Sequence, residues 1–279
     1  MTAAETSTPK AGLVARLQPW AEVVPVALLV LVAVWEIWAA SAVGSDVPSD
    51  ADWRSASDHV RASHGEGDLI VFAPSWLDPV GRLYLGDLIP VDMAARMDAA
   101  RYEVIWELSA RGQRAAEVDG LSADNEQRFG GVTVRRFQRA PAVVLTDFVS
   151  ELSRTRIVGK ASRRPTASLQ EVGFEPHRCV LTVPHAGEEV KILYPKVVLG
   201  TKLVGYVGLA DIFERRDIRQ SAGLEIIVGD QSVAFVQPGV DDGWVRFEAD
   251  TTPGRADVTF VASATSGRRL ICFAAEARQ

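Results

Sequence analysis

The sequence is poor in several residue types and motifs, and each shortage narrows what the protein can be. Its 279 residues include two cysteines, four histidines and one asparagine, Asn125, which lies in no Asn-x-Ser/Thr site, so glycosylation of the chain is not indicated. The chain has no Gly-x-Ser-x-Gly, Walker A or Gly-x-Gly-x-x-Gly motif, which removes the usual signatures of serine hydrolases and nucleotide-binding enzymes. Its formal net charge of −6 argues against nucleic acid as a partner.

The side chains that could carry metal or acid–base chemistry are badly spaced for it. His59 and His64 are five residues apart on a predicted helix, whereas a zinc pair on a helix needs a separation of four. Asp241 and Asp242 are adjacent, so their side chains are expected to point apart, and a calcium or sugar contact is the alternative use for them. We therefore predict no cofactor, no metal site and no catalytic residue. An unrecognised glycan-active enzyme stays open, because two convergent carboxylates about 5–9 Å apart would suffice.

The chain has one long hydrophobic run, at residues 23–43, and its only charge is Glu36. As a helix these residues would extend about 31 Å, close to the thickness of a bilayer core. Lys10 and Arg16 precede the run and acidic residues follow it, which predicts a cytoplasmic tail at 1–19 and a transmembrane helix at 20–44. The rest of the chain would then lie outside the cytoplasmic (inner) membrane, in the periplasm or an equivalent extracytoplasmic space.

The same run also fits a signal peptide, because Ala40-Ser41-Ala42 matches the pattern of a cleavage site. Under both interpretations the remainder of the chain is exported. Glu36 has two explanations as well: its carboxylate could reach headgroup water, or it could contact another membrane helix. We keep Glu36 as a candidate contact to a partner helix.

Residues 45–139 have the pattern of a small exported α/β domain. Residues 52–64 predict a helix with Asp52 as its cap, and residues 68–74 predict a short apolar strand that ends at Pro74. A helix and a turn follow, and further strands are expected within 101–112 and at 132–137. Helices that alternate with strands indicate an α/β layer.

Several short motifs of this segment resemble the outward-facing C-terminal domain of GT-C, family-39-like, lipid-linked-sugar glycosyltransferases. The match covers about 90 residues and rests on Asp52, Trp53, Arg54, Gly67, Asp68, Tyr84 and Trp106. In that family the catalytic acid lies in a polytopic membrane body, which this single-span chain does not have. The resemblance therefore implies an accessory domain without catalytic machinery, and a polytopic glycosyltransferase as a partner.

Residues 140–177 predict a helix followed by a flexible linker. Apolar residues recur at helical spacing over 143–157, and the polar segment 158–168 is typical of a joint. The segment is also locally basic, with Arg154, Arg156, Lys160, Arg163 and Arg164. A solvated connector explains the charge, and contact with anionic lipid headgroups or an acidic glycan is the alternative.

Residues 178–279 predict about eight short strands at regular spacing, which is typical of a two-sheet, jelly-roll-like β-sandwich. Cys179 lies in the first of these strands and Cys272 in the last, and terminal strands of jelly rolls often lie side by side. We therefore predict a disulfide between them in the exported domain, with two buried free thiols as the alternative.

The strand pattern and the stretch DDGWVRFEADT (241–251) resemble galactose-binding-like sandwiches of carbohydrate-binding modules. On this basis we expect a non-catalytic, single-pass envelope protein that serves surface glycan or glycolipid assembly by binding a glycan or a glycosyltransferase. A protein-interaction scaffold without a sugar ligand is the alternative. The candidate ligand-binding residues are Trp76, Tyr84, Tyr206, Arg215, Asp241, Asp242 and Trp244.

Overall fold

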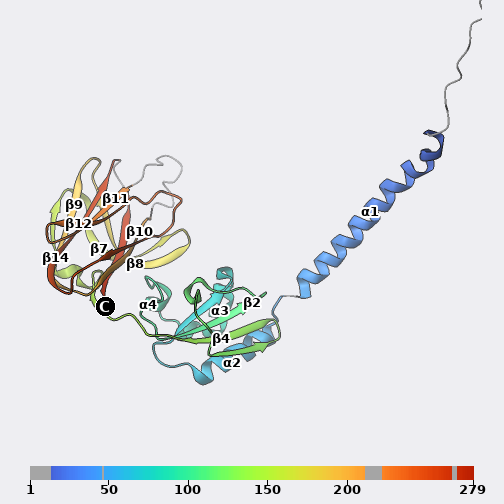
Figure 1. Ribbon diagram of the computed structural model, residues 1–279, viewed down its shortest axis with the longest axis horizontal. Helices are drawn as coiled ribbons and strands as arrows, with labels where there is room; N and C mark the ends of the chain where they lie inside the picture. Colours follow the sequence, from blue (N-terminus) through green and yellow to red (C-terminus); the bar gives the residue numbers. More distant parts are fainter. Residues whose placement is uncertain (1–13, 46, 211–221, 266–268) are drawn as a thin grey trace, which may run out of the picture.

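The computed structural model describes residues 14–45, 47–210, 222–265 and 269–279, and it contains a long helix, a small α/β domain and a β-sandwich (Figure 1). The fold class predicted from the sequence is thereby confirmed. Along the chain, and in Figure 1, the α/β domain lies between the helix and the sandwich.

The N-terminal helix α1 (Val14–Ser45) is long and apolar enough over Val24–Ser41 to cross a membrane. None of this window is buried against the rest of the described chain. Trp35 and Trp38 are exposed neighbours whose ring centroids are 5.3 Å apart. A signal sequence has the same length and composition, so the helix indicates an exported protein under either reading.

The α/β domain is built on a four-stranded sheet in the order β1-β2-β4-β3, in which only β1 and β2 are parallel. The strands are β1 (Leu69–Ala73), β2 (Val104–Ala110), β3 (Asn125–Phe129) and β4 (Val132–Gln138). The helices are α2 (Asp50–Ser63), α3 (Asp78–Leu85) and α4 (Val91–Ala94), with short 3-10 turns η1 (Ser75–Leu77), η2 (Gly86–Leu88) and η3 (Ala116–Val118).

The start of α2 differs from the prediction in one respect, because Ser49 and not Asp52 is its cap. The Ser49 hydroxyl accepts a hydrogen bond from the Asp52 amide at 3.2 Å, and the Asp52 carboxylate accepts one from the Ser49 amide at 2.9 Å. This reciprocal pair is a capping box. Trp53, Ala56 and Val60 then point into the domain core, as their helical spacing predicts.

The sandwich consists of two antiparallel sheets, one in the order β13-β10-β15-β8-β7, with β5 added beside β15, and one in the order β12-β11-β14-β9-β6. The first sheet contains β5 (Val144–Asp147), β7 (Ala161–Val172), β8 (Glu175–Pro184), β10 (Lys202–Leu209), β13 (Val245–Asp250) and β15 (Ile271–Arg278). The second contains β6 (Arg156–Gly159), β9 (Glu189–Leu199), β11 (Ala222–Val228), β12 (Gln231–Val236) and β14 (Gly254–Ala264). Stacked rings such as Phe260 and Phe273, with centroids 4.6 Å apart, fill the space between the sheets.

The helix and flexible linker predicted for residues 140–177 are wrong. The structure has β5, the 3-10 turn η4 (Ser150–Arg154) and β6 where the helix was expected, and β7 where the joint was expected. These strands pair with β15, β9 and β8, and β15 is more than 100 residues further along the chain. β6 and β7 are edge strands, so many of their side chains are exposed, and β7 is rich in polar residues as a loop would be.

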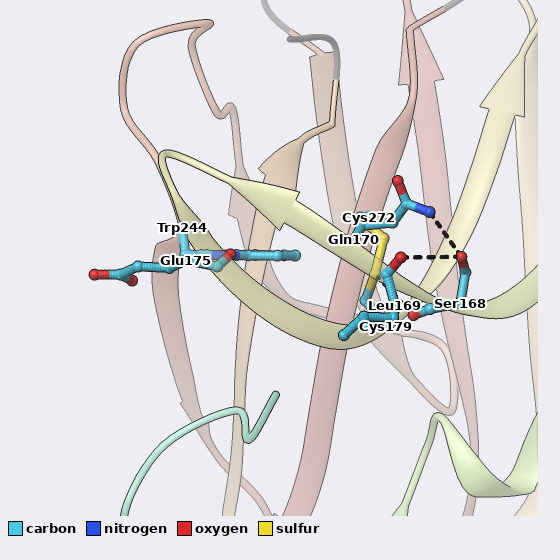
Figure 2. Close-up of a disulfide and its surroundings, with 7 residues drawn as sticks. All are labelled: Ser168, Leu169, Gln170, Glu175, Cys179, Trp244 and Cys272. Atoms are coloured by element: carbon cyan, nitrogen blue, oxygen red, sulfur yellow. Dashed lines mark hydrogen bonds between the residues drawn. A yellow bond between two sulfur atoms is a disulfide. The ribbon is translucent and has the colours of Figure 1, made fainter. Parts of the chain in front are cut away.

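The predicted disulfide is present. Cys179 of β8 and Cys272 of β15 lie on neighbouring strands with their Cα atoms 5.7 Å apart (Figure 2). The bond closes a loop with a sequence separation of 93 residues. Together with the apolar helix, it indicates an exported protein.

Candidate functional site

The sheet that contains β10, β15 and β8 turns one face toward the α/β domain, and this face carries polar side chains that are rare in a core. Register places Tyr206 opposite Ala274, Val204 opposite Glu276 and Lys202 opposite Arg278. Side chains alternate between the faces of a strand, so these residues share the outer face, whereas Phe273 packs inward on Phe260. The α/β domain docks here, with the Arg178 amide donating a hydrogen bond to the Ala95 carbonyl at 2.9 Å.

Ion pairs at this domain junction bind the two domains together. Arg278 donates two hydrogen bonds of 2.9 Å to the Asp98 carboxylate and one of 2.7 Å to Glu276. Arg101 of the α/β domain pairs with Glu276 and with Asp147, the latter at 2.7 Å. The side chains of Arg278 and Glu276 are only 7% and 2% exposed, so their charges are largely desolvated and depend on each other.

The electrostatics of the junction follow from this pairing. Burial alone would raise the pKa of Asp98, but the hydrogen bonds and charge of Arg278 outweigh it and hold that pKa below its ordinary value. The pKa of Arg278 is raised even though burial opposes its charge, because Asp98 and Glu276 stabilise the cation. Asp98 and Arg278 therefore form a fixed, charged pair at neutral pH.

A cavity of about 180 Å³ opens at the junction. Its side-chain lining includes one aromatic ring, Tyr102, together with hydrogen-bond donors and acceptors from both domains. The charged residues that line it are Asp92, Arg96, Asp98, Arg101, Asp147, Arg178 and Glu276. Asp92 and Arg178 lie at its exposed side: their side chains are 82% and 52% exposed and form a loose pair at 3.5 Å.

An aromatic cluster adjoins this cavity on the same face of the sheet. The His177 ring stacks on Trp244 with centroids 4.3 Å apart and meets the edge of Tyr206 at 5.9 Å. The Trp244 indole donates a 2.9 Å hydrogen bond to the Glu175 carbonyl, beside the disulfide in Figure 2. Tyr206 is opposite Ala274, which lines the cavity. Burial, with the nearby charge of Arg96, lowers the pKa of His177 to about 4, so the ring is neutral.

The candidate residues from the sequence fall into several places. Tyr206 and Trp244 come together around His177, next to the cavity but not in its lining. Asp241 and Asp242 precede Trp244 in the same loop, where the Asp242 carboxylate accepts a 2.7 Å hydrogen bond from the Gly239 amide. Arg215 lies outside the described residues.

The other two aromatic candidates belong to the α/β domain. Trp76 is 59% exposed in η1, and the Arg111 guanidinium lies 5.8 Å from its ring centroid. Tyr84 stacks on Trp53 with centroids 6.0 Å apart, and its hydroxyl donates a hydrogen bond to Asp50. These contacts give Tyr84 a packing role, whereas Trp76 stays accessible.

Four residues that line the cavity, Tyr102, Arg96, Arg101 and Arg178, were not among the candidates chosen from the sequence. Arg101 and Tyr102 lie just before β2, with Glu103 between Tyr102 and the strand, and Arg178 directly precedes Cys179. Nothing in a local window shows that residues 92–102 and 274–276 meet. The only sequence feature that pointed to the cavity was the presence of arginines next to apolar strands. Exposed arginines on an ordinary solvated surface would give the same pattern.

A larger cavity of about 290 Å³ lies between the β13–β14 connection and the β11–β12 hairpin. Thr251, Thr252, Pro253 and Gly254 form much of its wall, and no aromatic ring lines it. Among the described residues there is no group of three or more His, Cys, Asp or Glu side chains placed to hold a metal ion. The junction cavity is therefore the candidate site with the richer chemistry.

Comparison with known proteins yields similarities to solved structures at low sequence identity. No family model matches the chain, and no curated protein matches it. A solved structure of CBM51-2 with GlcNAc and INT domains from Clostridium perfringens ZmpB aligns over 62% of this chain and 40% of its own, with 13% identity and a TM-score of 0.36. CBM51 from a C. perfringens GH95 protein, with methyl-galactose, aligns over 48% of this chain and 99% of its own, with 13% identity and a TM-score of 0.32.

The K3 adhesin domain of Lys-gingipain from Porphyromonas gingivalis aligns over 49% of this chain and 98% of its own, with 8% identity and a TM-score of 0.33. A second ZmpB structure shares the CBM51-2 and INT domains, and this chain spans 29% of its length. None of these structures is described as a glycosyltransferase.

Proposed function

We propose that the protein is an exported, membrane-anchored glycan-binding protein whose binding site is the cavity between the α/β domain and the sandwich. The observation that carries the proposal is the lining of that cavity: one aromatic ring among arginine donors and carboxylate acceptors from two domains. A sugar needs donors and acceptors held in place for its hydroxyls, and charged partners form the stronger hydrogen bonds. The apolar C–H face of the sugar ring can pack on the ring of Tyr102.

The size and charge of the cavity specify the ligand further. Pockets for drug-sized molecules measure roughly 300–1,000 Å³, so a cavity of about 180 Å³ suits a single sugar ring, such as the end of a longer chain. Three arginines and four carboxylates line it. Their charges are balanced by ion pairs within the lining and by pairs with Arg278 and Glu117 just outside it. We therefore expect a neutral sugar, with Tyr206 and Trp244 beside the next ring.

We propose that this binding serves the assembly of surface glycans or glycolipids without catalysis by this chain. The buried junction carboxylates hold arginines, and the lowered pKa of Asp98 makes it a poor general acid at neutral pH. A scaffold with no sugar ligand remains the alternative, and a glycan-active enzyme would require one of these ion pairs to open.

The direct test measures binding of neutral and acidic monosaccharides and disaccharides to the full chain in phosphatidylcholine nanodiscs, by calorimetry. Asp92→Ala and Arg178→Ala change exposed side chains at the cavity, so the fold should survive. Each should weaken the binding of a neutral sugar by about tenfold, the usual worth of one hydrogen bond to a charged group.

Trp76→Ala is the matched control, because it removes an exposed aromatic from another surface. Loss of binding in Trp76→Ala alone would move the site to the α/β domain. If the wild type bound no sugar in the set, the scaffold alternative would take its place.

A second candidate role is docking to a polytopic glycosyltransferase, and Glu36 is the observation that favours it. It is the only charge in an exposed 18-residue apolar window of α1. A carboxylate at that depth gains most from a polar partner in another membrane helix. Purification of wild-type and Glu36→Leu protein from native membranes tests this: a transferase should accompany the wild type and be lost from the variant. Recovery of both proteins alone would count against it.

A further inference from the structure

The segment predicted as a linker is the place where the chain crosses from one sheet to the other. β6 is an edge strand of one sheet and β7 is an edge strand of the other, with Lys160 between them. We call Arg156, Lys160, Arg163 and Arg164 the basic crossover. All four are exposed. The sandwich thus has a run of cations along one side, in a chain whose net charge is −6.

Three of these cations have no acidic partner. In the part of the chain that the structure describes, no ion pair or side-chain hydrogen bond involves Arg156, Arg163 or Arg164. The acids nearby already have cations: Glu151 pairs with Arg154 at 2.8 Å, Glu188 with Lys160 at 3.6 Å and Glu189 with Lys191 at 3.3 Å. The basic crossover therefore presents uncompensated positive charge to solvent.

The backbone of β7 is irregular at the position where this charge is concentrated. Its register against β8 shifts between Ala161 and Arg163 and again between Arg163 and Thr166. In a regular strand adjacent side chains point to opposite faces, and bulges re-aim them. Here Arg163 and Arg164 are both exposed and Pro165 is buried, so two neighbouring guanidinium groups are available at one edge.

The position of the basic crossover on the sandwich favours a soluble ligand over the membrane of the anchor. Ala161 and Arg163 pair with Pro184 and Val183, at the opposite end of β8 from Arg178, which contacts the α/β domain. Six residues of strand separate Arg178 from Pro184, or about 20 Å. The α/β domain in turn lies between α1 and the sandwich (Figure 1). The charge is therefore remote from the segment that joins the membrane helix.

We infer that the basic crossover binds an acidic glycan, a polysaccharide whose repeating carboxylate or phosphate groups match the unpaired guanidinium groups. Arginine suits this ligand because its planar fork donates two parallel hydrogen bonds to one anionic group. The surface is separate from the junction cavity, whose charges are balanced, and the inference does not depend on sugar binding there.

The test uses the full chain in phosphatidylcholine nanodiscs and measures binding of labelled polygalacturonate, with neutral dextran as reference. The triple variant Arg156→Gln, Arg163→Gln, Arg164→Gln should bind polygalacturonate at least about tenfold more weakly, since each exposed ion pair contributes a factor of about two to five. The matched control is Arg111→Gln, Arg128→Gln, Arg255→Gln, which removes the same charge from three other exposed arginines and should leave the affinity nearly unchanged. Unfolding midpoints of both variants establish that they fold.

Several outcomes would overturn the inference. One is that the wild type binds polygalacturonate no better than dextran, and another is that both triple variants lose the same affinity, which would make the effect one of net charge. A third is that vesicles containing phosphatidylglycerol bind through the basic crossover and polygalacturonate does not, which would make the partner a membrane. Neutral-sugar binding at the junction cavity, measured on the same samples, distinguishes each outcome from failure of the proposed function.

Discussion

Arginine has two different environments at the two ends of the sandwich. At the junction Arg278 is 7% exposed and fully engaged by carboxylates, whereas at the basic crossover Arg156, Arg163 and Arg164 are exposed and unpaired within the described chain. Buried, paired charges such as Arg278 hold two domains in one arrangement. Exposed, unpaired charges such as those of the basic crossover remain available to attract a ligand of opposite charge. Formal charge alone does not distinguish the two roles, so burial and pairing must be known.

The largest effect should come from the disulfide that ties β8 to β15, the strands that lead to the junction. Replacing Cys179 and Cys272 with alanine releases a loop of 93 residues, and we expect a loss of about 4–5 kcal/mol in unfolding free energy. Urea unfolding followed by tryptophan fluorescence measures it. A loss below about 1 kcal/mol would mean that the outer sheet face holds together without its covalent link.

The next largest effect should come from Arg278→Gln. It leaves the largely buried Asp98 without its cation and Glu276 with Arg101 as its remaining partner, and breaking a buried pair from one side costs about 3–5 kcal/mol. Arg156→Gln is the same substitution at the basic crossover and should change the unfolding free energy by less than about 0.5 kcal/mol. Equal urea midpoints for the two variants would contradict the account, because Arg278 would then contribute no more to stability than the exposed Arg156.

A smaller effect should appear on acidification, through His177. The folded-state pKa of His177 is about 4, below the ordinary 6.5. Between pH 6.5 and pH 4, therefore, the unfolded chain binds a proton at this residue and the folded chain does not. Stability should therefore be lost as pH falls from 6.5 toward 4, by about 3 kcal/mol over the window. Unfolding curves at pH 7 and 4.5 test this, and His177→Phe, which keeps a ring against Trp244, should remove most of the slope.

The smallest effect on stability is expected for the triple variant of the basic crossover. Exposed residues away from caps and buried networks usually contribute within about 0.5 kcal/mol. Its urea midpoint should match that of the wild type while its affinity for polygalacturonate falls. A marked loss of stability would show that the three arginines hold the edge strands together, and the contrast with the junction would then disappear.

Local patterns in the sequence predicted which face of a helix is buried and which cysteines pair. Trp53, Ala56 and Val60 recur at helical spacing and form the buried face of α2. Cysteines at the two ends of the strand-rich region predicted the disulfide. The helix face needed only a period of 3.6 residues, whereas the disulfide also needed an exported compartment and the expectation that the terminal strands of a jelly roll lie side by side.

The remaining features depend on contacts between distant residues. Residues 143–157 have apolar positions spaced like a helix, yet they pair with β15 and β9, and tertiary pairing overrides the local pattern. The cavity was unpredictable for the same reason, because Asp98 meets Arg278 across 180 residues of sequence. Tyr206 and Trp244 were chosen for their chemistry alone, and only the structure brings them to His177.

The central claim is that the junction cavity binds a neutral sugar, and fluorine NMR of the full chain labelled with 5-fluorotryptophan tests it most directly. Seven tryptophans give a small set of resonances, and Trp244→Phe and Trp76→Phe assign the two that matter. During titration with neutral disaccharides to about 10 mM, enough to load a site with a Kd of about 1 mM, the Trp244 resonance should shift and saturate while that of Trp76 stays fixed. An unmoved Trp244 with every sugar, or a shift of Trp76 alone, would contradict the claim.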